Sequence, residues 1–445
     1  MYHPLRLNVV RALIAGLIGG WLLLPAVSRA AEGETPPDPS FGPLTLDQTI
    51  NLVLTSDPKI RSGMEAVRQA NADVWTASLP PNPTMTVAGS LFPLGRPFTP
   101  QAPGGPPQLD AMVQYPIDWF LFGKRAAAVA SASAGVSVSE ADYADLVRKR
   151  VTETALAFYD LLEAKALLDV ARQDLENIQR VESVTKKAVD NGGRPQVELN
   201  RIRLELLGTR RTNREAESTL VGGKAKLRAL LGGMAPGGDI DVSGTLDGRF
   251  TPPSQPLEEA VAEAVQNRPD IESLRRKVLK SEADILVQQR AARPEVKPQF
   301  DVGHQYQHSL GSPDASMWGV GVEVSVPLFD RNQGNRAKAI SAAAQSEHDL
   351  QAALLDLRAE IEQAVQSLST AQQNAASVAQ EELQLAAQVR DAIGKAYAAG
   401  GRPLLDVLDA QRNYRETYKT YITSRADYWR ALYRYQSALG KQVSP

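Results

Sequence analysis

Side chains suited to catalysis or tight metal binding are scarce in this chain of 445 residues. It has no cysteine and only four histidines, which excludes thiolate metal sites, disulfides and cysteine nucleophiles. His304 and His308 lie in a predicted strand, where residues four apart are separated by about 13 Å, too far to share one metal ion. No phosphate-binding loop is present. We therefore predict no catalytic residues, no metal site and no cofactor.

Asp406 and Asp409 are the acidic residues whose spacing suggests a chemical role. They lie three residues apart in a predicted helix, so both carboxylates would project from one face. On a single solvated helix such a pair is ordinary. If several copies of the chain brought these pairs around a narrow water-filled pore, the rings of carboxylates would favour cations and repel anions.

The charge of the chain does not indicate a nucleic-acid partner. The 49 lysines and arginines are mixed with 51 acidic residues, which gives a net charge of −2. A nucleic-acid-binding surface would require a basic cluster.

Residues 1–30 are expected to form a secretory signal peptide. Two arginines precede the apolar run LIAGLIGGWLLLPAV, and small residues precede an expected cleavage site between Ala30 and Ala31. The alternative is a retained anchor helix, although the run is short for a membrane span. Residues 31–43 have the composition of a flexible linker. No later stretch reaches the roughly 20 apolar residues that a membrane helix needs.

The rest of the chain is predicted to be two similar halves. The tetrapeptide GGRP occurs at 192–195 and again at 400–403. A shift of 211 residues also superimposes Pro58 on Pro269 and Pro116 on Pro327. Such self-similarity indicates two tandem structural repeats. The predicted segments are a first repeat at 44–231, a linker at 232–256, a second repeat at 257–440 and a short tail at 441–445.

Each half is expected to contain a helix, two strands, a very long helix, the GGRP turn and another long helix. The long segments lack internal proline and carry apolar residues every three or four positions, which is typical of coiled-coil packing. The predicted strands span 83–92, 108–117, 297–308 and 316–327. The predicted long helices span 121–191, 195–231, 330–399 and 403–440.

The four strands alternate between apolar residues and polar residues or glycine. In SMWGVGVEVSVPLF, the residues Trp318, Val320 and Val322 would share one face, opposite Gly319, Gly321 and Glu323. Strands of about 9 to 11 residues with this pattern suit the lipid-facing wall of a membrane barrel. The alternative is a strand with one face in a protein core. Four strands are too few to close a barrel, so two copies would give eight strands and three would give twelve.

The chain resembles the outer-membrane efflux proteins, the TolC-like ducts of Gram-negative bacteria. The features that carry the resemblance are the tandem halves, the strand pairs ending at Pro116 and Pro327, and the sequence YxxGxRxxxDVLDA at 397–410. The resemblance implies a mixed α and β membrane protein. In it, three protomers form a twelve-stranded outer-membrane β-barrel, four strands from each, continued by a long periplasmic α-helical coiled-coil barrel.

The resemblance also assigns roles to residues near the two turns. A periplasmic gate would be formed by Glu198, Tyr397, Arg402, Asp406 and Asp409, with Arg402 pairing with Glu198. Glu198 stands where a family prototype has aspartate. The turn residues expected to dock onto an adaptor are Gly192, Gly193, Arg194, Pro195, Gly400, Gly401 and Pro403.

This resemblance implies that the protein would be a passive exit duct of a tripartite efflux system. Its expected partners are two further copies of itself, a periplasmic adaptor, an inner-membrane pump of the resistance-nodulation-division type and outer-membrane lipid. Its helical part would lie in the periplasm. Within the family, the resemblance points to the heavy-metal branch. Two alternatives stay open: a duct for type I protein secretion, and a periplasmic coiled-coil scaffold without a pore.

Overall fold

The computed structural model describes residues 42–96, 98–102, 104–232, 240–253, 255–377 and 380–441. The predicted signal peptide and most of the predicted linker at 31–43 lie outside the described residues. So do part of the predicted linker at 232–256 and all but the first residue of the tail at 441–445.

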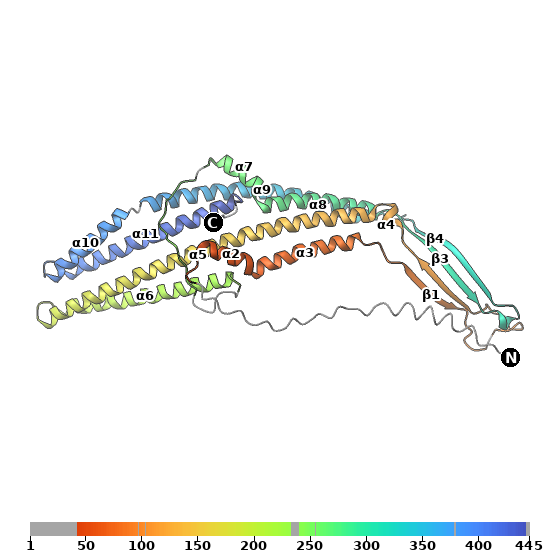
Figure 1. Ribbon diagram of the computed structural model, residues 1–445, viewed down its shortest axis with the longest axis horizontal. Coiled ribbons are helices and arrows are strands. Elements are labelled where there is room, and N and C mark those ends of the chain that lie inside the picture. Colours follow the sequence, from red (N-terminus) through yellow and green to blue (C-terminus); the bar gives the residue numbers. More distant parts are fainter. Residues whose placement is uncertain are drawn as a thin grey trace. The chain divides into compact units, whose positions relative to one another are not determined.

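The described strands form one antiparallel sheet to which both halves of the chain contribute (Figure 1). The strand order follows the chain, and the central pair joins the two halves, with Met112 opposite Asp301. Among the described residues β1 and β4 pair on one side only, so they are the edges of the sheet. The strands are β1 (Thr84–Ser90), β2 (Gln108–Gln114), β3 (Glu295–Gln305) and β4 (Ala315–Ser325).

The two faces of the sheet differ sharply in chemistry. Apolar side chains form rows across the strands: Val113 lies opposite Phe300, which lies opposite Val320, and all three are exposed. On the other face Gln114 donates to Gln299 (2.8 Å) and to Glu323 (3.2 Å). Because neighbouring residues of a strand point to opposite faces, the alternation in the sequence produces this separation directly.

Helices make up most of the remaining described chain. The first half contains α2 (Leu46–Ser56), α3 (Pro58–Ser78), α4 (Asp118–Leu121), α5 (Lys124–Asp190) and α6 (Gln196–Leu230). The second half contains α7 (Leu257–Asn267), α8 (Pro269–Ala291), the 3₁₀ helix η1 (His308–Leu310), α9 (Gln333–Ser377), α10 (Gln380–Ala398) and α11 (Leu404–Ala438).

Several predicted boundaries were wrong, and left-handed residues account for two of them. Gly123 has φ 65°, so the helix predicted from residue 121 is split into α4 and α5. Asn332 has φ 57°, and α9 starts at the next residue rather than at 330. The predicted helix at 330–399 is described as α9 and α10 on either side of residues 378–379. His308 belongs to η1 and not to a strand, because β3 ends at Gln305.

Separate apolar clusters hold the helices together. In one, Phe158 and Leu161 of α5 pack with Val53 of α2 and Leu227 of α6. In another, Leu357 and Ile361 of α9 pack with Tyr428 and Tyr435 of α11. On α11 tyrosines recur every seven residues, at 414, 421, 428 and 435, and the last two are buried core residues. The partly buried Trp429 packs against both clusters, so the cores of the two halves adjoin.

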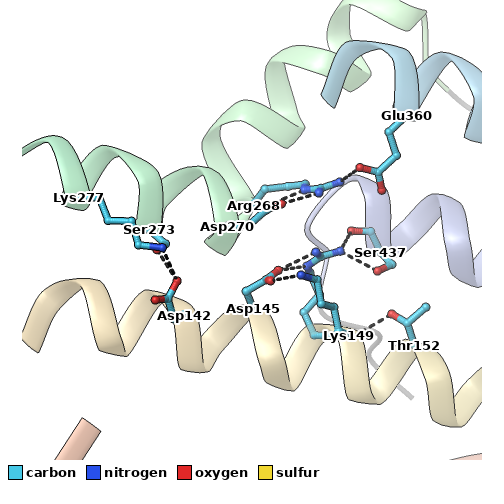
Figure 2. Close-up of polar contacts among 11 residues, drawn as sticks. Asp142, Asp145, Lys149, Thr152, Arg268, Asp270, Ser273, Lys277, Glu360 and Ser437 are labelled. Atoms are coloured by element: carbon cyan, nitrogen blue, oxygen red, sulfur yellow. Dashed lines mark hydrogen bonds and ion pairs between the residues drawn. The ribbon is translucent and has the colours of Figure 1, made fainter. Parts of the chain in front are cut away.

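Pro58 and Pro269 have equivalent positions in the two halves, and the residue before each one anchors its helix to the long helix of the same half. In the first half, Asp57 precedes Pro58 and forms a buried ion pair with Arg150 of α5. In the second half, Arg268 precedes Pro269 and pairs with Glu360 of α9 at 2.7 Å (Figure 2). The two joints therefore have the same position in each half but opposite signs of charge.

Further polar contacts join the halves. Asp142 of α5 accepts hydrogen bonds from Ser273 and, at 3.3 Å, from Lys277, both on α8 (Figure 2). Arg148 of α5 donates to the backbone oxygen of Ser437 on α11 at 2.8 Å. These contacts hold α5 against the helices of the second half.

Among the described helices, none is both long and apolar enough to cross a membrane. Within the same residues, no group of three or more histidine, aspartate or glutamate side chains is arranged to hold a metal ion.

Candidate functional site: the two hairpin turns

The two GGRP turns close their hairpins with the same backbone geometry. Gly192 has φ 72° and Gly400 has φ 82°, a left-handed conformation that favours glycine. In the first turn the amide of Gly192 donates to Val189 and that of Gly193 to Ala188; in the second, Gly400 donates to Tyr397 and Gly401 to Ala396. Both turns are Schellman motifs, which satisfy the last carbonyls of the preceding helix.

The helices after the turns were predicted to begin at Pro195 and Pro403, but both begin one residue later. Pro195 and Pro403 are extended N-cap residues, with ψ 147° and 158°, and the helices begin at Gln196 and Leu404. The backbone oxygen of Pro195 accepts a hydrogen bond from the amide of Glu198 at 3.1 Å. Each proline therefore sets the direction in which the returning helix leaves the turn.

Tyr397 joins the second hairpin to the first. Its side chain is 3% exposed, and its hydroxyl hydrogen-bonds the hydroxyl of Thr185 on α5 at 2.8 Å. Its backbone oxygen accepts from Arg194 at 3.1 Å, and the guanidinium of Arg194 lies 4.0 Å from the centre of its ring. One tyrosine thus makes a hydroxyl, a backbone and a cation–π contact across the hairpins.

The ion pairs at the turns differ from the predicted pairing of Arg402 with Glu198. Glu198 pairs with Arg194 at 3.0 Å, and both side chains are largely buried. Arg402 pairs with Asp406, one helical turn away on its own helix, at 3.3 Å, and its side chain is 61% exposed. Within the described chain, Arg194 makes the ion pair with Glu198 that was predicted for Arg402. Arg194 itself was predicted only to dock onto an adaptor.

Asp406 and Asp409 lie on the side of α11 that faces away from the chain's own core. Leu404, Val407 and Ala410 on the same helix are buried, whereas Asp409 is exposed and Asp406 is half-buried. Asp406 is partly neutralised by Arg402, while Asp409 has no ion-pair partner among the described residues. The two carboxylates are therefore available to a neighbouring molecule or to solvent, and they are electrostatically unequal.

An apolar cluster lies beneath these polar contacts. Tyr397, Leu404 and Val407 of the second hairpin pack against four residues of the first: Ile178, Leu199, Ile202 and Leu206. The cluster is small, so the contact between the hairpins depends on few side chains.

A second polar contact crosses the hairpins farther from the turns. Arg415 of α11 pairs with Asp174 of α5 at 3.1 Å and lies 3.8 Å from Glu205 of α6. Burial raises the pKa of the Asp174 carboxyl above its usual range, even though Arg415 opposes the shift. Sequence reasoning missed this pair and Thr185, because single polar residues inside long helices carry no local signal.

Nothing in this arrangement resembles a catalytic centre. The groups at the turns are ion pairs, a buried phenol and exposed carboxylates, without a nucleophile held by a base. Contacts of this kind can hold two helical hairpins together and can be broken without covalent chemistry.

Comparison with known proteins identifies the family. The sequence profile described as outer membrane efflux protein matches residues 49–233 and, a second time, residues 260–441. The chain belongs to the outer membrane efflux protein family. Members of this family are transport channels and not enzymes. The residues between the two matches overlap the predicted linker at 232–256.

Individual members of the family are similar along most of their length. The cobalt-zinc-cadmium resistance protein CzcC of Cupriavidus metallidurans is 25% identical over 390 residues, which is 87% of each chain. The fold is similar to that of CusC, with a TM-score of 0.73, 18% identity and coverage of 89% of this chain and 92% of that one. The fold is also similar to that of the outer membrane channel CmeC of Campylobacter jejuni, with a TM-score of 0.73 and 17% identity. That match covers 90% of this chain and 87% of CmeC.

Proposed function

We propose that this efflux protein is the outer-membrane exit duct of a tripartite efflux system. Three copies would form a twelve-stranded barrel in the membrane and a helical tunnel in the periplasm. The duct would carry its cargo passively, since energy would come from an inner-membrane pump of the resistance-nodulation-division type, reached through a periplasmic adaptor. We also attribute the two halves to a duplication, which the two profile matches and the identical turn geometries support.

The observation that carries this proposal is the two-faced sheet with free edges. Val320, Phe300 and Trp318 are among the large apolar side chains exposed on one face, and the opposite face bears hydrogen-bonded glutamines and carboxylates. Exposed apolar surface of this extent needs a cover, and lipid provides one. In hydrocarbon, however, the unpaired edges of β1 and β4 would be costly, so the sheet must close with other copies.

The sheet alone does not decide the number of copies. Four strands per chain allow eight or twelve strands in a closed barrel. The similarity to solved outer membrane channels supports the choice of three copies that the family resemblance implied.

We assign the gate of the duct to the hairpin turns. Tyr397, Arg194 and Glu198 would hold the two hairpins of one protomer together, and opening would require these contacts to break. Asp406 and Asp409 would form carboxylate rings at the constriction, and the turns would dock onto the adaptor. The contacts of such a gate would need to be weak, because a docking partner must be able to break them.

Divalent metal cations are the cargo that we favour. CzcC is described as a cobalt-zinc-cadmium resistance protein, and carboxylate rings would admit cations. Deletion of the gene would then raise the sensitivity of the host to cobalt, zinc or cadmium. Restored resistance with the intact gene would complete the test, and unchanged sensitivity to all three metals would contradict this choice of cargo.

The duct itself is tested with purified protein in planar bilayers. We expect extraction from membranes to require detergent, a particle mass of three chains, and stepwise cation-selective conductance. Protein that is soluble without detergent and gives no conductance would instead support the periplasmic scaffold. Conductance together with lost export of a polypeptide in the deletion strain would support the secretion duct.

A further inference from the structure

The end of the sheet nearest the helices carries an unusual combination of side chains. Three segments meet there: 117–125 after β2, 290–297 entering β3, and 326–338 after β4. The amide of Ile117 donates to Val296 at 2.9 Å, and Glu295 lies opposite Ser325, which brings the ends of the three strands together. The side-chain amide of Asn332 donates to the backbone of Gln288 at 2.8 Å, which ties the third segment to the end of α8.

Large apolar side chains at this end are strongly exposed. Phe120 is 72% exposed and Phe329 is 92% exposed, and their neighbours Leu121 and Leu328 are exposed as well. Both pairs lie within seven residues of the end of a strand, β2 for the first pair and β4 for the second. Exposed aromatic residues at the edge of an apolar belt are typical of the boundary between a membrane and water.

Positive charge is concentrated in the same three segments. Residues 117–125, 290–297 and 326–338 contain eight lysines and arginines against three acidic residues, a net charge of +5 in a chain whose total is −2. At the opposite end of the sheet, 91–107 and 306–314 contain one arginine and one aspartate. The excess of positive charge therefore lies only at the end of the sheet nearest the helices.

Several of these cations form no ion pair with any residue that the structure describes. Lys124 pairs with Asp118, Arg125 lies over the ring of Trp119, and Lys297 pairs with Glu295 and Glu323. Five other cations are exposed and form no ion pair with any described residue. These five, which we call the collar, are Arg290, Arg293, Arg331, Arg336 and Lys338.

We propose that the collar binds the headgroups of acidic phospholipids in the leaflet nearest the helices. The inference rests on the proposed function, which places the apolar face of the sheet in the membrane. An acidic phospholipid matches both parts of the surface, since its phosphate meets the arginines while its acyl chains cover Phe120 and Phe329. A soluble anion would satisfy the charges but would leave the apolar side chains in water. Anionic lipid surfaces attract adjacent lysines and arginines in this way.

The test measures lipid binding to the full-length protein purified in detergent. Phosphatidylglycerol and phosphatidylcholine with identical acyl chains are titrated separately, and the ratio of their affinities is the readout. We expect phosphatidylglycerol to bind more tightly. The combined variant Arg293→Gln, Arg331→Gln and Arg336→Gln should lose about fivefold in affinity for each arginine removed, with no change for phosphatidylcholine.

Two matched variants separate charge at the collar from charge in general. Arg201→Gln, Arg210→Gln and Arg214→Gln remove the same charge from exposed positions of α6 and should leave the preference intact. Replacement of the three collar arginines by lysine keeps the charge and should keep most of the preference. If the glutamine variant fails to fold, the intact protein provides the test, because high salt should weaken phosphatidylglycerol binding.

Several results would overturn the proposal. They are equal affinity of the intact protein for both lipids, equal loss in the α6 variant, and displacement of the lipid by the same concentration of inorganic phosphate. Dissociation of the assembly in the collar variant would assign the arginines to contacts between copies. Conductance recorded from the same preparations shows separately whether the duct exists, so failure of the collar and failure of the duct remain distinguishable.

Discussion

Arg194 makes three contacts at the hairpin turns, with the carboxylate of Glu198, the backbone of Tyr397 and the ring of Tyr397. Its counterpart in the second turn, Arg402, is exposed and pairs only with Asp406 among the described acidic residues. The two turns share a sequence, yet Arg194 contacts the other hairpin and Arg402 contacts only its own helix among the described residues. This difference separates their expected effects on the proposed gate.

Substitution of Arg194 should therefore affect the proposed gate more than substitution of Arg402. Arg194→Gln removes a partly buried ion pair and a cation–π contact, about 2 kcal/mol in all, which is roughly a thirtyfold shift toward the open state. Tyr397→Phe removes one hydroxyl contact, about 1 kcal/mol or roughly fivefold. Both shifts are measured as open probability in planar bilayers. Arg402→Gln is the matched control, and an effect as large as that of Arg194→Gln would restore the predicted Arg402 latch.

The two aspartates beyond the second turn should also differ. Asp406 is partly neutralised by Arg402, whereas Asp409 is exposed and without an ion-pair partner in the described chain. We expect Asp409→Asn to lower cation selectivity more than Asp406→Asn, and the double variant to lower it most. Reversal potentials across a potassium chloride gradient measure this. Unchanged selectivity in the double variant would place both residues outside the constriction.

At the scale of helices, each half is fixed by an ion pair at the same joint, and the charges are exchanged between the halves. Asp57 pairs with Arg150, and both side chains are buried; the second partner of Arg150, Glu153, is half-exposed. Arg268 is buried too, but its partner Glu360 is half-exposed, and Arg268 has a second partner in Asp270 at 2.6 Å. Burial opposes the ionisation of Asp270, yet Arg268 outweighs it and holds the pKa of Asp270 below its usual range.

Removal of one charge should cost far more at the first joint than at the second. Asp57→Asn keeps an acceptor for the amide of Lys59 but leaves the buried Arg150 with only the half-exposed Glu153, at a cost of about 3 kcal/mol. Glu360→Gln removes a half-exposed charge from an arginine that retains Asp270, and should cost less than about 1 kcal/mol. Thermal unfolding of the two variants in detergent compares them, and equal losses would contradict this account.

At the scale of the whole molecule, the sheet faces two environments in the proposed assembly. Its apolar rows would meet lipid, and its glutamines and carboxylates would line a water-filled interior. The helices continue from the end of the sheet that carries the collar, so the boundary between membrane and periplasm would fall at the residues that change from β to α structure.

A charge should therefore be tolerated on one face of the sheet only. Val320→Arg places a cation in the middle of the apolar face and should destabilise the membrane form by about 2–4 kcal/mol. Gln299→Arg places the same side chain on the polar face of the adjacent strand, where it should be accommodated. The share of each variant recovered in the outer-membrane fraction is the measurement. Equal recovery would mean that the apolar face does not meet lipid.

Local pattern was sufficient to predict much of the architecture. The alternation in SMWGVGVEVSVPLF indicated a strand with one apolar face, because side chains in a strand alternate by geometry alone. The GGRP turns were likewise readable, since glycine is favoured at a positive φ and the pattern fixes where a helix must end. The absence of internal proline indicated long helices, but left-handed Gly123 and Asn332 decide where two of them begin.

Pairings between distant residues were decided only by the tertiary structure. Thr185 and Tyr397 are 212 residues apart, and no local periodicity relates them. The sequence offered two arginines in identical turns, and the choice of Arg194 over Arg402 depended on which guanidinium the packed hairpins bring over the ring of Tyr397. Local sequence determines the elements because their geometry repeats every few residues. Contacts between elements depend on how the elements pack, and that is a property of the whole fold.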